Sequence, residues 1–142
     1  MAPRSPRHRR SDDDLRSDAR ERALVLLYEA ETKGLDPIDV INSQVVEPDS
    51  LTKTLVEGVG SRRDELDAAI ARHSRGWTIE RMPVIDRTVL RIAGFELLER
   101  PEVPVAVVLD EAVELAKRFS TDESGRFVNG VLAALVTELR GR

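Results

Sequence analysis

Hydrophobic residues recur every three or four positions along most of the sequence, which is the spacing of one face of an α-helix. The clearest instance runs from about Arg16 to Gly34, where apolar residues share a face and the glycine follows them as a C-terminal stop. This pattern predicts a first helix over that range. Its apolar positions are Ala23, Leu24, Leu27 and Tyr28.

The same periodicity continues in further segments that short connections join. The second predicted helix begins with Asp36 as a cap and Pro37 at the first helical position. In the segment 49–76 the pattern passes through Gly58 and Gly60, which weaken a helix unless another helix packs closely there. We expect the remaining helices over 84–100, 103–119 and 120–140, with a turn around Thr78 and with helix 84–100 at the centre.

The composition also favours an all-helical protein. Of the 142 residues, 41% are hydrophobic, 34% are charged and only 4% are aromatic, a balance typical of helices rather than of aromatic-rich sheets. That length and apolar content suffice for one domain with its own core. Residues 1–15 differ, because prolines, arginines and aspartates leave almost no apolar side chains there. We therefore expect a disordered basic and acidic tail over 1–15 and a single compact all-α domain of six to seven helices over 16–142.

Several classes of function are excluded by what the chain lacks. Without cysteine it has neither disulfides nor thiolate metal sites. No apolar run reaches the length of about 18 residues that a membrane span needs, so we expect a cytoplasmic protein without membrane contact. The formal net charge of -4 disfavours a general attraction to phosphate backbones, and any nucleic-acid binding must therefore be local.

Signatures of catalysis are missing as well. Gly125 and Gly130 match the glycine spacing of a phosphate-binding loop, but Val131 stands where that loop needs lysine. The acidic residues around Asp110 have no companion histidine for a metal site. His73 lies near a helix end without a partner that would make it a general base. We expect no enzyme activity, no metal and no cofactor.

One predicted helix start carries residues that a core alone does not require. Ser120 and Glu123 have the spacing of a capping box, and the free N–H groups and dipole of this first turn favour an anion such as phosphate. A nearby arginine adds charge, and a phenylalanine offers a face to an unstacked base. The alternative is that the serine only caps the helix and the phenylalanine belongs to the core. The residues concerned are Lys117, Arg118, Ser124, Gly125, Arg126 and Phe127, while Gly130 is expected to permit close helix packing.

Arg16 and Arg20 form a second basic cluster in the first helix. They lie four positions apart on one stripe, which we place on a side away from Leu24 and Leu27. Like charges on one stripe cost some helix stability. The stripe is therefore either an ordinary solvated face or a contact surface for a polyanion.

Two parts of the sequence resemble the bacterial NusB family of transcription antitermination factors. They are the run from Ile85 to Leu132, with the blocks "EAVELAKRF" and "SGRFVNGVL", and the segment "RSDARERALVLLYEAE". The resemblance covers about residues 16–138. It implies a non-catalytic fold of two packed helical bundles that binds boxA RNA of ribosomal-RNA leader transcripts together with NusE, a protein of the small ribosomal subunit. It also implies other Nus factors and RNA polymerase as partners.

The resemblance further implies which residues make these contacts. The arginine-rich motif of the family falls on Arg16 and Arg20, although Ser17 and Asp18 interrupt it here. The second RNA-facing segment falls on Lys117, Arg118, Glu123, Ser124, Arg126 and Phe127. The NusE-facing region falls on Glu80, Asp86 and Arg87.

The main alternative to this RNA-binding factor is a helical protein-interaction scaffold without direct RNA binding. NusB-like domains also occur fused to ribosomal-RNA methyltransferases, but a chain of 142 residues leaves no room for that catalytic domain. The family includes monomers and homodimers, and a homodimer would bury the same arginine face that RNA needs.

Overall fold

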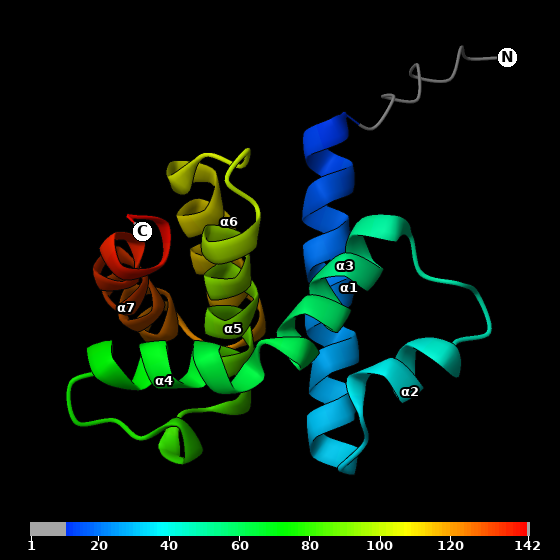
Figure 1. Cartoon of the computed structure of the whole chain (residues 1–142), viewed down its shortest axis with the longest axis horizontal. Coiled ribbons are helices and arrows are strands. Elements are labelled where there is room, and N and C mark those ends of the chain that lie inside the picture. Colours follow the sequence, from blue (N-terminus) through cyan, green and yellow to red (C-terminus); the bar gives the residue numbers. More distant parts are fainter. Residues whose placement is uncertain (1–10, 142) are drawn as a thin grey trace, which may run out of the picture.

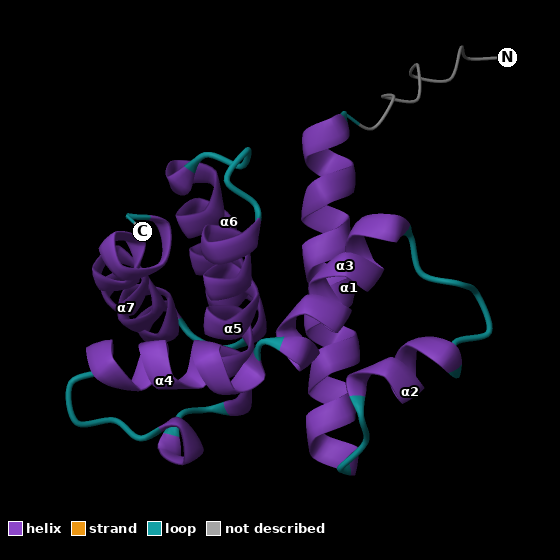
Figure 2. Ribbon diagram, in the orientation of Figure 1, coloured by secondary structure: helices purple, strands orange, loops and turns teal. Residues whose placement is uncertain are grey.

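The computed structural model describes residues 11–141, and every regular element in that range is helical (Figures 1 and 2). This confirms the all-α class and the predicted number of helices. No helix in the described range is long and apolar enough to cross a membrane. The elements are α1 (Asp12–Lys33), α2 (Pro37–Asn42), α3 (Ser50–Ser61), α4 (Arg63–His73), the 3-10 helix η1 (Ile79–Arg81), α5 (Val84–Glu99), α6 (Val105–Phe119) and α7 (Asp122–Arg140).

The helices form two bundles that meet along α5. Helices α1, α2 and α3 pack together on one side, while α4, α6 and α7 surround α5 on the other (Figure 1). Every residue from Thr88 to Leu97 of α5 is buried, because the helix also contacts α1 and α3. The expectation that this segment is the central helix is confirmed, as is the two-bundle arrangement.

Helix α1 begins earlier than expected, at Asp12. The Ser11 hydroxyl accepts a hydrogen bond from the Asp14 N–H at 3.1 Å, and the Asp14 carboxylate accepts one from the Ser11 N–H at 3.3 Å. Aspartates in the first turn are favourable there because they lie at the positive end of the helix dipole. The predicted tail boundary after residue 15 is therefore wrong for this acidic run, whereas residues 1–10 lie outside the described residues.

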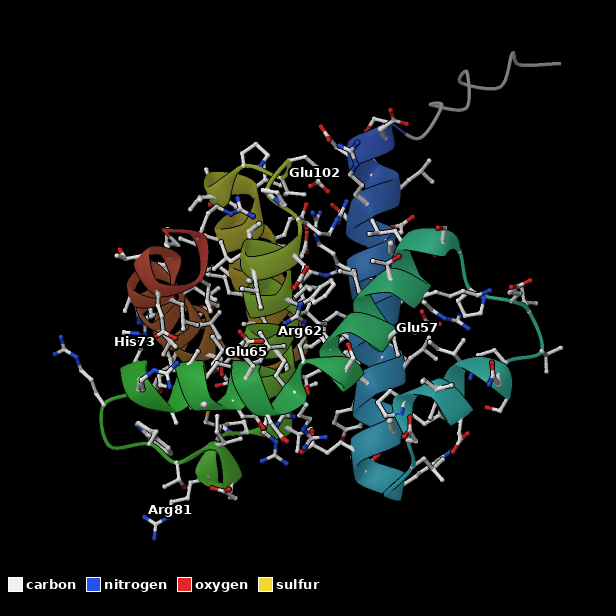
Figure 3. The ribbon with its side chains drawn as sticks, in the orientation of Figure 1. Glu57, Arg62, Glu65, His73, Arg81 and Glu102 are labelled. Atoms are coloured by element: carbon white, nitrogen blue, oxygen red, sulfur yellow. The ribbon has the colours of Figure 1, made fainter. Side chains whose placement is uncertain are left out.

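The helix predicted over 49–76 is two helices in the structure. Arg62, between α3 and α4, leaves helical geometry with φ -105° and ψ 11°. Its side chain contacts the carboxylates of Glu65, at 3.0 Å, and of Glu99 (Figure 3). Because of this break, α4 packs against α5 and α7 and belongs to the second bundle.

Gly58 allows α3 to approach α5 closely. A methyl group added at this position would lie 2.2 Å from the Phe95 ring. A methyl group at Gly60 would make only an ordinary contact of 3.6 Å with Pro37. At Gly130 nothing lies within 4 Å, so the prediction that this glycine permits helix packing is wrong.

We expect alanine at these glycines to change stability in opposite directions. Gly58→Ala should lower the free energy of unfolding by about 1–3 kcal/mol, because the buried Phe95 must move to admit the methyl group. Gly130→Ala should raise it by up to about 1 kcal/mol, since alanine is the better helix former and displaces nothing. Urea denaturation followed by circular dichroism measures both changes. Equal effects of the two substitutions would contradict the packing role of Gly58.

Candidate nucleic-acid interface

The corner between α6 and α7 differs from the predicted capping box. Ser120 ends α6, because its N–H still donates to the last turn of that helix, and Thr121 is the cap of α7. The Thr121 hydroxyl oxygen accepts a hydrogen bond from the Ser124 N–H at 3.0 Å. Asp122 and Glu123 add negative charge to the same turn. The Ser124 and Gly125 N–H groups are already bonded to Thr121 and two carboxylates share this turn, so both features disfavour the expected phosphate site on free N–H groups.

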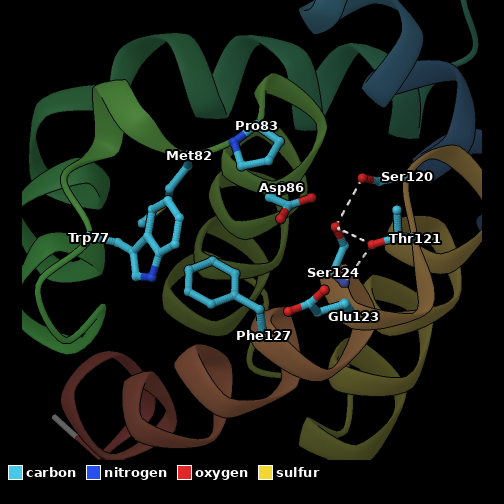
Figure 4. Close-up of a pocket in the computed structure, with 9 residues that line it drawn as sticks. All are labelled: Trp77, Met82, Pro83, Asp86, Ser120, Thr121, Glu123, Ser124 and Phe127. Atoms are coloured by element: carbon cyan, nitrogen blue, oxygen red, sulfur yellow. Dashed lines mark hydrogen bonds between the residues drawn. The ribbon is translucent and has the colours of Figure 1, made fainter.

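A hollow of about 360 Å³, which we call the Asp86 pocket, opens beside this corner (Figure 4). Asp86 of α5 points toward Ser120 and Ser124, whose hydroxyl oxygens lie 2.9 Å apart. The pocket therefore brings one residue assigned to NusE together with residues assigned to RNA. Its lining residues are Trp77, Met82, Pro83, Asp86, Ser120, Thr121, Glu123, Ser124 and Phe127.

The Asp86 carboxyl group is buried without a full set of hydrogen bonds. The residue is 3% exposed, and its Oδ1 atom has no hydrogen-bond partner within residues 11–141. Burial raises the pKa of this carboxyl, and the hydroxyls of Ser124 and Ser120 offset only part of the rise. An unpaired buried acceptor costs about 1–3 kcal/mol. A hydrogen-bond donor supplied from outside would remove that cost.

Trp77 and Phe127 form an aromatic ridge at the edge of the pocket. Their ring centroids lie 6.1 Å apart with 63° between the planes, an edge-to-face contact. Phe127 is partly buried and packs against the core, whereas Trp77 is 51% exposed. The two interpretations of Phe127 are therefore compatible, since the side chain contacts the core and still exposes part of its ring.

The same two rings line a second hollow of about 400 Å³, which we call the arginine hollow. Arg75 and Arg126 are exposed there, and neither forms an ion pair with a described residue. His73, at the end of α4, also lies on this hollow (Figure 3). The Asp86 pocket, on one side of the two rings, thus offers a buried carboxyl group and hydroxyls. The arginine hollow, also lined by these rings, offers guanidinium groups without ion pairs to described residues.

The two predicted cations at the end of α6 have different surroundings. The stem of Lys117 lies over Gly125, where an added methyl group would come within 2.8 Å of the lysine Cγ atom. Arg118 lies 3.1 Å from Glu21 of α1 and its guanidinium is 5.3 Å from the centre of the Phe119 ring. Lys117 therefore belongs to the α6–α7 corner, while Arg118 is turned toward α1.

Arg20 does not present its charge to solvent. It is 2% exposed and donates two hydrogen bonds to the Glu96 carboxylate, at 2.7 and 3.0 Å. Burial acts to lower the pKa of Arg20, but its hydrogen bond and charge interaction with Glu96 outweigh burial and raise it. Placing Arg20 away from Leu24 was wrong, because residues four positions apart share a helical face. Arg16 is exposed and lies 3.5 Å from Asp13.

The residues assigned to NusE also differ in whether a partner protein could reach them. Glu80 is exposed on η1. Arg87 is turned inward, where it donates to carbonyl oxygens of the η1 turn at 3.2 to 3.4 Å and pairs with Glu31. Arg87 therefore holds the η1 turn in place, and Glu80 and Asp86 are the members of this group that a partner could contact.

Sequence reasoning missed the parts that the loop after α4 contributes. Arg75 and Gly76 have positive φ angles of 42° and 83°, and the Ser74 hydroxyl closes the turn by donating to the Trp77 carbonyl oxygen at 2.7 Å. A single tryptophan beside an arginine and a glycine in a polar loop was the available signal. Among the described residues, no group of three or more His, Cys, Asp or Glu side chains could hold a metal ion.

The fold and these hollows define a small all-helical binding protein. Comparison with known proteins then gives its family: the NusB family model matches residues 17–137. The chain belongs to the NusB family, whose members are non-catalytic transcription antitermination factors.

Individual relatives agree with this assignment. The transcription antitermination protein NusB of Saccharopolyspora erythraea is 48% identical over 126 residues, covering 84% of this chain and 85% of the relative. The solved structure of T. maritima NusB is 30% identical, with a TM-score of 0.78 over 87% of this chain and 91% of that one. A solved complex of the antitermination factors NusB and NusE with double-stranded RNA contains a chain that is 27% identical, with a TM-score of 0.74 over 87% of this chain and 96% of that one.

We expect Arg20→Ala to act on stability rather than directly on ligand binding. It should lower the free energy of unfolding by about 3–5 kcal/mol, because the buried Glu96 would lose its two hydrogen bonds from Arg20 and keep, within residues 11–141, only Arg100 at 3.3 Å. Arg16→Ala, at an exposed site, should change it by no more than about 0.5 kcal/mol. Denaturant titration of both variants measures the difference. A fully stable Arg20→Ala protein would contradict the structural role of this ion pair.

Proposed function

We propose that this protein binds boxA RNA of ribosomal-RNA leader transcripts together with NusE and helps to assemble the antitermination complex on RNA polymerase in the cytoplasm. The observation that carries the proposal is the α6–α7 corner, where the unpaired Arg126 adjoins the partly exposed Phe127 and the Asp86 pocket. The solved NusB–NusE complex with RNA supports both partners by family membership.

The RNA contact depends on local charge, since the whole chain is acidic at -4. Lys117 and Arg126 are exposed near the same corner and form no ion pair with a described residue. Cations left free in an acidic protein can each neutralise one phosphate, and Phe127 can stack with an unpaired base. Arg16 and Arg118 extend this surface along α1 and α6, although each is paired with a carboxylate, of Asp13 and Glu21, whereas Arg20 supports it from inside.

NusE binding is assigned to Asp86 and the neighbouring Glu80. The unpaired Oδ1 atom of Asp86 accepts a hydrogen bond from any donor that reaches the pocket, and a charged donor gives the strongest one. Such a contact would relieve the cost of burying the carboxyl group. The exposed Glu80 on η1 adds a second negative charge for a basic partner.

Fluorescence anisotropy with labelled RNA tests the proposal as a whole. A boxA RNA and a scrambled RNA of equal length are titrated at two salt concentrations, with and without NusE. We expect tighter, salt-sensitive binding to boxA that NusE strengthens. Negligible binding to both RNAs in the presence of NusE would overturn RNA binding and leave the protein-interaction scaffold, including self-association as a homodimer.

Substitutions at the corner should weaken RNA binding without unfolding the protein. Arg126→Ala should cost about 1.5–3 kcal/mol in RNA binding and reduce the slope of log affinity against log salt by roughly 0.7. Phe127→Leu keeps apolar volume for the core and should still cost about 1–3 kcal/mol in RNA binding through lost stacking. Arg22→Ala is the matched control, because Arg22 is exposed and its hydrogen-bond partner within residues 11–141 is Gln44. Equal affinities of the three variants would place the RNA elsewhere.

Asp86→Asn should stabilise the protein and weaken NusE binding. The folded-state pKa of Asp86 lies above its ordinary value of 3.8, so ionisation disfavours folding as pH rises through that raised pKa. The variant should therefore gain about 1 kcal/mol in stability at pH 7, and the gain should vanish below about pH 4. Denaturant titrations across this pH range measure it.

The same variant should bind NusE about tenfold more weakly, which corresponds to about 1.4 kcal/mol. Asp39→Asn, at an exposed position on α2, is the control for loss of one carboxylate. An unchanged NusE affinity together with the gain in stability would mean that Asp86 is buried for another reason.

A further inference from the structure

The arginine hollow combines exposed cations with an exposed aromatic ring. Acidic residues outnumber basic ones by 26 to 22, yet Arg75 and Arg126 face this hollow without an ion pair to any described residue. The carboxylate beside the hollow is already engaged, because Glu138 lies 3.0 Å from both Arg72 and His73. The hydrogen bond from Arg72 and the nearby His73 lower the pKa of Glu138 to about 2, despite its partial burial. The two free guanidinium groups are therefore available to an external anion.

The hollow is also lined by an exposed aromatic ring and has unfilled space next to α7. Trp77 is 51% exposed beside the free arginines, so part of its ring is accessible to a ligand in the hollow. Gly130 and Ala134 of α7 lie on the same hollow, and an added methyl group at Gly130 would meet nothing within 4 Å. A glycine inside a helix costs about 1 kcal/mol relative to alanine. Since no helix packs there, the missing side chain leaves space for a ligand.

The loop that carries Trp77 is held in shape. The Trp77 N–H donates to the Ser74 carbonyl oxygen at 3.1 Å, and the Ser74 hydroxyl donates to the Trp77 carbonyl oxygen at 2.7 Å. Ser74 is itself buried. This turn fixes the backbone of Arg75 and Trp77 beside the hollow, so a ligand does not have to order the loop itself.

We propose that the arginine hollow binds a nucleotide unit of single-stranded RNA, with a base on the Trp77 ring and a phosphate between Arg75 and Arg126. Arginine recognises phosphate through two parallel hydrogen bonds, and an exposed aromatic ring stacks with an unpaired base whatever its identity. A duplex would not offer its bases to the ring. The inference rests on the RNA binding proposed above and adds Arg75 and Trp77 to the contact surface.

Trp77 is the only tryptophan of the chain, so its fluorescence reports on this site directly. The unlabelled full-length protein is titrated with single-stranded boxA RNA, and the same titration is followed by anisotropy with labelled RNA. We expect RNA to quench the Trp77 emission with the affinity that anisotropy gives, and to protect the ring from acrylamide. Because Trp77 also lines the Asp86 pocket assigned to NusE, the titration is repeated at saturating NusE, where RNA should still quench the emission further.

Substitutions test separately the positive charge of Arg75, the aromatic ring of Trp77 and the open space beside Gly130. Arg75→Ala should weaken RNA binding about tenfold and lower the salt slope by roughly 0.7, while Arg22→Ala, in the other bundle, should change neither. Trp77→Leu should lose about tenfold in affinity, and Trp77→Phe should recover most of it because it keeps an aromatic face. Gly130→Leu should fill the hollow and weaken binding several-fold without removing a charge. Circular dichroism confirms that each variant is folded.

The outcomes distinguish this inference from the proposed function. If no RNA binds in the anisotropy experiment, RNA binding itself fails and the hollow has no RNA ligand. If RNA binds but Trp77 emission and the affinities of Arg75→Ala and Gly130→Leu stay at wild-type values, the RNA passes elsewhere and this inference alone is wrong. If NusE without RNA changes Trp77 emission and RNA adds no further change, the occupant is protein and the inference is again wrong.

Discussion

The buried ion pair between Arg20 and Glu96 joins the two helical bundles. Arg20 comes from α1 and Glu96 from the enclosed helix α5, with exposures of 2% and 1%. Arg91 of α5 makes a second link of the same kind, to Glu31 of α1 at 3.2 Å and to Asp67 of α4 at 2.7 Å. Neither buried charge is tolerable without its partner, so these pairs fix how α1 lies against α5. The position of every surface that the two bundles share depends on them.

This constraint explains why the basic surface is smaller than the arginine content suggests. Arg20 stabilises the junction, Arg87 holds the η1 turn, and Arg118 pairs with Glu21. Arginine in a helical protein has two competing uses, since the same fork that binds phosphate also satisfies buried carboxylates. What remains free gathers at the α6–α7 corner and on the loop after α4, and these lie beside each other because Phe127 contacts Trp77.

Sequence patterns predicted the features that depend on neighbouring residues in the chain. They failed for side chains whose position depends on a partner far away in the sequence. Helical periodicity, the Gly34 stop and the central helix follow from spacing, and the structure confirms them. The burial of Arg20 depends on Glu96, which lies 76 positions further along the chain and has no local signature. The cap of α7 is Thr121 rather than Ser120 because the end of α6 uses Ser120. Trp77 carried no periodic signal, as it lies in a loop.

The two hollows around the aromatic ridge suggest how a pair of partners could bind side by side. Asp86 keeps an unpaired carboxylate oxygen in one hollow, while Arg75 and Arg126 keep unpaired cations in the other. The buried carboxylate oxygen is unfavourable without a donor, whereas the exposed guanidinium groups are solvated in the free protein and remain available to an anion. Because Trp77 and Phe127 line both hollows, a partner that settles in one restricts the ring that the other uses. Binding in one hollow would then lower the entropic cost of binding in the other, which is a physical route to cooperation between a protein partner and RNA.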